Sequence, residues 1–183
     1  MIPMRKLERA FYSESLSIFL KTQQAEILGH LAQNNHFELS QEQRSAWLVE
    51  INILQRALIS LSGHIFFEYA IPRMGKRADV ILLINQAIFV VEFKVGSHSF
   101  DQHAIDQVTD YALDLKNFHA GSIARPIYPI LLATSGATPN HQEVIPNKDN
   151  VYSTLFATPN TIKELLVRCI SPITYGIFRT FQN

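Results

Sequence analysis

Residues 77–95 place charged side chains inside a stretch of chain that is otherwise almost entirely apolar. Two runs rich in Val, Ile, Leu and Phe, at 77–84 and 87–95, are separated only by Asn85 and Gln86. Asn at the first position favours a two-residue hairpin turn. Strands that are apolar on both faces lie in the middle of a sheet that is covered by helices. This stretch therefore predicts a central β-hairpin in an α/β protein.

The pattern around this hairpin is helical before it and mixed after it. Trp47, Ile51 and Leu54 recur at helical spacing, and Ser40 can cap their helix. The order of elements predicts a mixed sheet, in which a hairpin meander precedes a helical crossover. We expect one domain over 1–183, with an N-terminal helical extension at 1–38 and an α/β core at 40–170. The predicted helices are 13–20, 23–33, 40–61, 103–119 and 160–169, and the other strands are 65–71, 127–133 and, more weakly, 151–156.

Composition excludes several classes of protein. Sixteen Lys and Arg balance sixteen Asp and Glu, which argues against a polybasic membrane binder or a histone-like protein but leaves room for a local basic cleft. The single cysteine, Cys169, excludes internal disulfides and a cysteine-based zinc site, and fits a reducing compartment. Residues 1–9 lack the apolar core of a signal peptide, and the apolar run at 80–91 is too short to span a bilayer. We expect a soluble cytoplasmic protein.

The charged residues of the hairpin fall at informative positions. A two-residue turn pairs Ile84 with Ala87, and the same register places Asp79 opposite Glu92 and Arg77 opposite Lys94. Opposed side chains in such a ladder have Cβ atoms about 4.5–5.5 Å apart. Because Lys94 lies two residues after Glu92, it points to the same face.

Two carboxylates this close on an apolar sheet repel each other and resist ionisation. A divalent cation that prefers oxygen ligands, Mg²⁺ or Mn²⁺, removes the conflict by binding both. A lysine beside the cation can stabilise the charge that develops on a phosphoryl group. The spacing thus suggests metal-assisted hydrolysis of phosphodiesters. The alternative is an ion-pair cluster of Asp79, Arg77, Glu92 and Lys94 that fixes the strand register and binds nothing.

The same residues resemble a known superfamily. Asp79, followed after the hairpin by Glu92-Phe93-Lys94, resembles the signature of the PD-(D/E)XK nucleases. Gln107 and Tyr111 resemble the Q-x-x-x-Y element of several of its families. The proline of the superfamily's name is absent before Asp79, as it is in many divergent members.

A more specific resemblance is to the nuclease-like domain that precedes a helicase-type ATPase in uncharacterised bacterial proteins related to the Schlafen group. Relatives of that type often carry Lys-Gln-Trp where this chain has Lys94-Val95-Gly96, and no Walker A motif occurs here. The four matching blocks are Arg44-Ser45-Ala46-Trp47, Phe67-Glu68-Tyr69-Ala70-Ile71-Pro72, Lys76-Arg77-Ala78-Asp79-Val80, and Val91-Glu92-Phe93-Lys94 followed by the helix at 103–118.

The resemblance implies a restriction-endonuclease-like fold and roles for individual residues. Asp79 and Glu92 would be catalytic ligands of Mg²⁺ or Mn²⁺, and the backbone carbonyl of Phe93 would complete the site. Lys94 would be the catalytic lysine, and Gln107 would orient that lysine, a water or the substrate.

Other residues are weaker candidates. Glu50 and Glu68 could assist metal binding, since superfamily members often carry a glutamate on such a helix and the context of Glu68 resembles the family. The alternative for Glu50 is a boundary residue in a salt bridge. Lys76 and Arg77 could contact phosphates, or be solvated charges at a hairpin base. We include Tyr111 among the candidates for nucleic-acid contact.

Taken together, the sequence predicts a Mg²⁺-dependent nuclease acting on DNA, with RNA as the second choice, in defence or nucleic-acid processing. The competing hypothesis is a catalytically silent module of the same fold that binds nucleic acid or a protein. The choice between endo- and exonuclease activity stays open, as does the oligomeric state, a dimer included.

Overall fold

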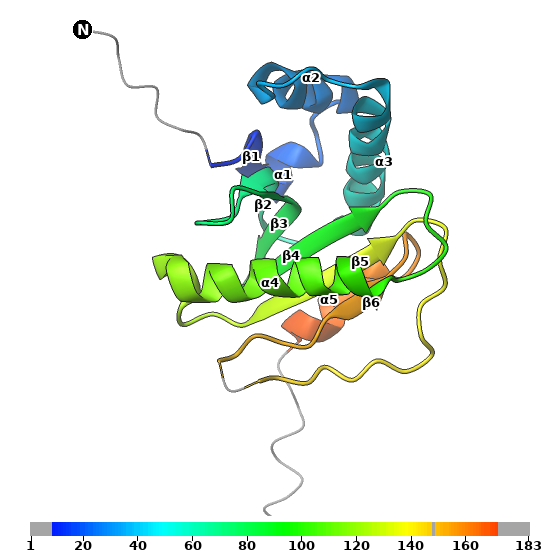
Figure 1. Ribbon diagram of the computed structural model, residues 1–183. Coiled ribbons are helices and arrows are strands. Elements are labelled where there is room, and N and C mark those ends of the chain that lie inside the picture. The colour runs from blue at the N-terminus through cyan, green and yellow to red at the C-terminus, as the bar shows by residue number, and fades with distance from the viewer. Residues whose placement is uncertain (1–8, 148, 172–183) are drawn as a thin grey trace, which may run out of the picture.

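The computed structural model describes residues 9–147 and 149–171, which form a six-stranded sheet flanked by helices (Figure 1). Strands β1 to β4 pair antiparallel in chain order, whereas β4, β5 and β6 run parallel, with α4 as the crossover between β4 and β5. This arrangement confirms the predicted mixed α/β sheet and is compatible with a restriction-endonuclease-like fold. The strands are β1 (Tyr12–Ser15), β2 (Gly63–Ala70), β3 (Arg77–Ile84), β4 (Ala87–Lys94), β5 (Ile127–Ala133) and β6 (Leu155–Ala157).

Helices cover both faces of the sheet. One hydrophobic core lies between the sheet and α1, α2, α3 and α5, and a second lies under α4. Alternate residues of β4 enter the two cores, Phe89 the first and Val90 the second, which explains why the central strands are apolar on both faces. The helices are α1 (Leu16–Phe19), α2 (Gln24–Asn34), α3 (Gln41–Ala57), α4 (Gln102–Phe118) and α5 (Ile162–Ile170).

The β3–β4 hairpin has the predicted turn and register, but its regular pairing is shorter than expected. Asn85 adopts the left-handed conformation (φ +54°), and the paired residues run from Ile84 and Ala87 to Val80 and Val91. The expected pairs Asp79–Glu92 and Arg77–Lys94 are not part of the ladder. The prediction that these residues are direct cross-strand partners is therefore wrong.

A kink in β2 lies beside this break. Glu68 has a φ of +52°, which is uncommon for a residue with a side chain. The β2–β3 ladder pairs Phe67 with Val80 and Tyr69 with Ala78 but omits Glu68 and Asp79 between them. Phe67 lies in the first core and Tyr69 in the second, so the strand changes face at Glu68. Asp79, next to this kink, is therefore outside the regular ladders with β2 and β4.

The N-terminal segment differs most from the prediction. Residues 12–15 form β1, an edge strand of the sheet, where the sequence predicted the start of a helix. The boundary between a helical extension and an α/β core near residue 38 is therefore wrong in part, and residues 1–8 lie outside the described part of the chain. Helix α3 ends at Ala57 instead of residue 61, and β6 is shorter than the predicted strand. None of the helices described here is long and apolar enough to cross a membrane.

Candidate active site

Four acidic side chains from four elements meet at one end of the sheet, and we call them the carboxylate cluster. Glu50 comes from α3, Glu68 from β2, Asp79 from β3 and Glu92 from β4. Glu50 is only 4% exposed. Its burial, reinforced by the negative charges of Asp79, Glu68 and Glu92, raises its pKa well above the usual value. The fold thus brings together all four acids that the sequence singled out.

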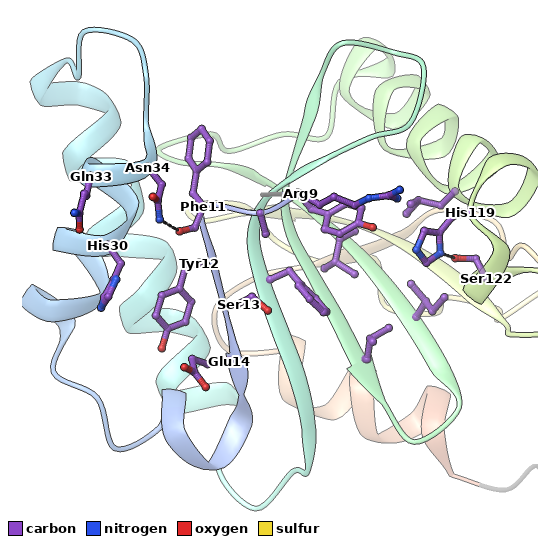
Figure 2. A pocket seen from close by; sticks show the side chains of 17 residues that line it. Arg9, Phe11, Tyr12, Ser13, Glu14, His30, Gln33, Asn34, His119 and Ser122 are labelled. Atoms are coloured by element: carbon purple, nitrogen blue, oxygen red, sulfur yellow. Dashed lines mark hydrogen bonds between the residues drawn. The ribbon is translucent and has the colours of Figure 1, made fainter. Parts of the chain in front are cut away.

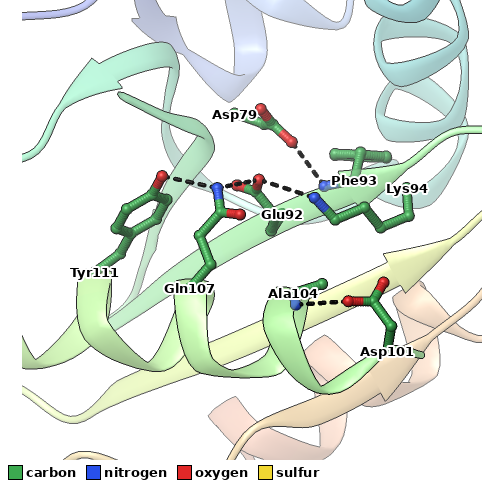
Figure 3. Close-up of polar contacts among 8 residues, drawn as sticks. All are labelled: Asp79, Glu92, Phe93, Lys94, Asp101, Ala104, Gln107 and Tyr111. Atoms are coloured by element: carbon green, nitrogen blue, oxygen red, sulfur yellow. Dashed lines mark hydrogen bonds and ion pairs between the residues drawn. The ribbon is translucent and has the colours of Figure 1, made fainter. Parts of the chain in front are cut away.

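Glu92 and Lys94 face the same side of β4, as their spacing predicts (Figure 3). Lys94 Nζ lies 3.5 Å from Glu92 Oε1, and this is the only ion pair in the described residues. The lysine side chain keeps 29% of its surface exposed, while that of Glu92 keeps 6%. Burial raises the pKa of Glu92, and the lysine charge opposes that rise. A partly exposed ammonium group therefore lies beside a buried acid.

Helix α4 contributes Gln107. Its Nε2 donates hydrogen bonds to Glu92 Oε1 and to Tyr111 Oη, each at 2.8 Å (Figure 3). This confirms that the residue reaches the acids, as expected from the sequence. Tyr111 is only 1% exposed and packs in the second core. The expectation that Tyr111 contacts nucleic acid is wrong, because its spacing on the apolar side of α4 turns the ring inward.

Asp79 is held by the backbone of the neighbouring strand. Its Oδ2 accepts a hydrogen bond of 2.7 Å from the N–H of Phe93. Burial and the charge of Glu92 raise the pKa of Asp79 well above its usual value, against the opposing effects of the Phe93 N–H and Lys94. The two acids are therefore close in space, although they are not ladder partners.

Trp47 is a residue whose contribution to the site the sequence did not reveal. Its Nε1 donates a 2.9 Å hydrogen bond to Glu68 Oε1, which ties α3 to the kink in β2. Burial raises the pKa of Glu68, while this bond and the charge of Arg77 lower it. A buried Trp needs an acceptor for its N–H, but only the tertiary structure shows which one it finds.

The free oxygens of the cluster fit a divalent cation. Glu92 Oε2 and Glu50 Oε2 are buried and have no hydrogen-bond partner in the described residues. Asp79 and Glu92 each use one oxygen to bond to the chain. Within residues 9–147 and 149–171, no group of three or more His, Cys, Asp or Glu side chains forms a ready-made metal cage. Mg²⁺ matches such a partial donor set, because it commonly binds one or two carboxylates and completes its shell with water and phosphate.

The basic residues of the β2–β3 turn have separate surroundings. Arg77 stacks over the ring of Phe11 at 4.1 Å and donates hydrogen bonds to the backbone oxygens of Glu68 and Arg9. These contacts join the segment just before β1 to the kink, and a contact of Arg77 with phosphate stays a prediction. Lys76 is exposed at the turn, and its contact with phosphate stays a prediction.

A separate groove of about 750 Å³ runs beside β1 (Figure 2). Aromatic and aliphatic side chains, among them Phe66, Tyr69 and Leu115, form much of its wall. It contains no member of the carboxylate cluster. Because the closely spaced acids lie elsewhere, we place the candidate reaction site at the cluster.

Comparisons with known proteins give distant similarities only. Neither a protein-family model nor a curated protein sequence matches the chain. A repair endonuclease from Pyrococcus abyssi matches 56% of this chain with 22% identity and a TM-score of 0.35. Protein VC1899 from Vibrio cholerae matches 79% of the chain with 11% identity and a TM-score of 0.36. The matched region spans 41% of each of these two proteins, which is less than half of their length.

Proposed function

We propose that this chain is a metal-dependent nuclease, with Mg²⁺ or Mn²⁺ bound by Asp79 and Glu92 and a phosphodiester of DNA as substrate, RNA being the alternative. One observation carries the proposal. Of four partly or fully buried acids only Glu92 forms an ion pair in the described residues, and two of their buried oxygens have no partner there. Buried carboxylates in that state are costly unless they are protonated or bind a cation.

A purely structural ion-pair cluster would be arranged differently. In that interpretation Arg77 and Lys94 would neutralise Asp79 and Glu92. Arg77 instead donates to backbone oxygens, and only Lys94 pairs with an acid in the described residues. The excess of negative charge favours a site that receives a cation.

The surrounding residues have distinct roles in the proposed reaction. A bound divalent cation would act as a Lewis acid on the phosphodiester. Lys94, whose ammonium group is partly exposed beside Glu92, would stabilise the negative charge that develops on the phosphoryl oxygens. Gln107 and the Phe93 N–H hold Glu92 and Asp79 with their second oxygens free for the metal. A role in defence or nucleic-acid processing rests on the resemblance given above and stays a prediction.

Cleavage assays with two site variants test the proposal. Fluorescent single- and double-stranded DNA and RNA are incubated with wild type, Lys94→Ala and Asp79→Asn, with Mn²⁺ or with a chelator. We expect wild-type cleavage at metal concentrations on the order of millimolar and none with chelator. Lys94→Ala should lower the rate about 10²-fold or more while metal binding persists, since an ammonium group is not a ligand. Asp79→Asn should lose both cleavage and metal binding.

Two exposed residues on other surfaces provide matched controls. Lys163→Ala and Asp110→Asn remove the same charges and should leave cleavage unchanged. Absence of a metal-dependent product from every substrate would refute the nuclease. Nucleic-acid binding that weakens with salt, needs no metal and is insensitive to Asp79→Asn would instead identify a binding module.

A further inference from the structure

The side-chain amide of Gln107 has only one orientation compatible with its neighbours. Glu92 Oε1 already accepts from Lys94 Nζ, and the NH₂ group of Gln107 faces the same oxygen at 2.8 Å. The same nitrogen also donates to Tyr111 Oη. Both amide protons are therefore used inside the protein.

The amide oxygen is left free by this arrangement. Gln107 Oε1 has no hydrogen-bond partner among the described residues, and it points away from Tyr111, on the side where Lys94 lies (Figure 3). A free acceptor beside a lysine and two acids is suited to accept a hydrogen bond from a water molecule. Rotation of the amide would replace this acceptor with an NH₂ group and would bring its oxygen against Glu92.

We propose that Tyr111 is a positioning residue that acts through Gln107, fixing its amide so that Oε1 orients the water that attacks the phosphodiester. This inference rests on the proposed nuclease function. The water oxygen forms a bond to phosphorus, and the bond from phosphorus to the leaving sugar oxygen breaks. The water loses one proton to solvent and the leaving oxygen gains one, so Gln107 keeps its protonation state throughout.

The position of Tyr111 supports an indirect role. The ring is almost fully buried, so it reaches the site only through its hydroxyl. Burial raises the pKa of Tyr111, and its hydroxyl oxygen accepts from Gln107 at 2.8 Å. Tyr128 offers a matched control, because it is another buried tyrosine whose hydroxyl donates to a backbone oxygen, that of Cys169.

Steady-state cleavage kinetics test the role of Tyr111. Tyr111→Phe keeps the ring and removes one hydrogen bond, so we expect kcat to fall roughly three- to tenfold with KM changed less than about twofold. Tyr128→Phe should change neither constant. In a Gln107→Ala background, Tyr111→Phe should have no further effect on kcat, because the residue through which it acts is gone. An equal loss in both backgrounds, or wild-type kinetics for Tyr111→Phe, would overturn the inference while the nuclease stands.

The amide protons give a readout that needs no activity. In wild type, both side-chain NH₂ resonances of Gln107, assigned by their loss in Gln107→Ala, should exchange slowly with solvent. One of them should exchange rapidly in Tyr111→Phe, and neither should change in Tyr128→Phe. Fast exchange of both in wild type would overturn the inference. Slow exchange together with absent cleavage would refute the proposed nuclease function. The hydrogen bond from Gln107 to Tyr111 would then be confirmed, but the role of Gln107 Oε1 in orienting a water would be refuted.

Discussion

At Glu50, burial and hydrogen bonding are in conflict. The side chain is 4% exposed, its Oε2 lacks a partner in the described residues, and three other acids lie close enough to raise its pKa. A carboxyl group whose pKa is higher in the folded than in the unfolded protein favours folding only while it is protonated. This contribution is fully present below the ordinary pKa of 4.5 and is lost as the pH rises through the folded value. Glu50 should therefore destabilise the metal-free protein at neutral and alkaline pH.

Glu50→Gln tests this conflict, because it removes the ionisable proton and keeps the shape. In metal-free buffer at pH 8 we expect the variant to unfold at a higher temperature than wild type, by about 2–4 °C for each kcal/mol gained. At pH 4 the two proteins should unfold at similar temperatures. Thermal unfolding followed by circular dichroism measures both values, and Glu164→Gln on the exposed side of α5 is the control. A less stable Glu50→Gln at pH 8 would mean that the carboxylate is well solvated or paired.

Residue types and spacing predicted which side chains lie at the candidate site, but they did not predict the hydrogen bonds that each one forms. The shared face of Glu92 and Lys94 follows from strand periodicity, whereas Gln107 was expected from the resemblance of its Q-x-x-x-Y element. The hydrogen bond from Trp47 to Glu68 joins residues 21 positions apart on different elements, and no local pattern specifies it. Tyr111 shows a different limit. Its burial follows from its place on the apolar side of α4, but only the structure shows that its hydroxyl accepts from Gln107.

Among the elements, α4 places Gln107 within hydrogen-bond distance of Glu92 on β4. Asp101 caps its N-terminus and accepts a 2.9 Å hydrogen bond from the N–H of Ala104 (Figure 3). The carboxylate also interacts favourably with the positive end of the helix dipole. The β3–β4 hairpin and α4 were both predictable, because turn chemistry and periodicity are local. The kink at Glu68 was not, since its unusual φ angle occurs together with contacts to Trp47 and Arg77, which lie on other elements.

Removal of the α4 cap should weaken the fold without touching the carboxylate cluster. Asp101→Ala should lower the free energy of unfolding by about 1 kcal/mol, within a range of roughly 0.5–2 kcal/mol. Asp101→Asn keeps a capping oxygen and should restore most of the loss. Urea unfolding at pH 7 measures the difference. Equal stability of Asp101→Ala and wild type would show that α4 packing alone fixes its first turn.

In the whole molecule, the central strands of the sheet are shielded from solvent, while one end of the sheet carries the charged side chains. The two hydrophobic cores cover both faces of β3 and β4. The sequence indicates this burial, because these strands do not alternate between apolar and polar residues. Strand β1 completes the sheet, yet its sequence Tyr-Ser-Glu-Ser carries no such signal. It is defined by pairing with β2 over a separation of about 50 residues, which local reasoning does not reach. The carboxylate cluster is thus built on a largely predictable hairpin, to which α3 adds Glu50 and β2 adds Glu68.

A cation that binds only the folded protein stabilises the whole molecule by mass action. When Mg²⁺ or Mn²⁺ is present at ten times its dissociation constant, the gain is about 1.4 kcal/mol, which should raise the melting temperature by roughly 3–6 °C. Because Asp79 and Glu92 have raised pKa values, protons compete with the metal at low pH, and the increase should be larger at pH 8 than at pH 5.

Thermal unfolding of wild type with and without Mn²⁺, at both pH values, measures this effect. Asp79→Asn should abolish most of the increase, while Asp110→Asn, which removes an exposed carboxylate of α4, should retain it. K⁺ at equal ionic strength controls for general salt effects, which act on exposed charges and do not distinguish the two variants. A shift that is the same in Asp79→Asn and wild type would place the metal elsewhere on the protein. No shift at pH 8 with Mn²⁺ in the millimolar range would mean that the carboxylate cluster is not a metal site in the absence of nucleic acid.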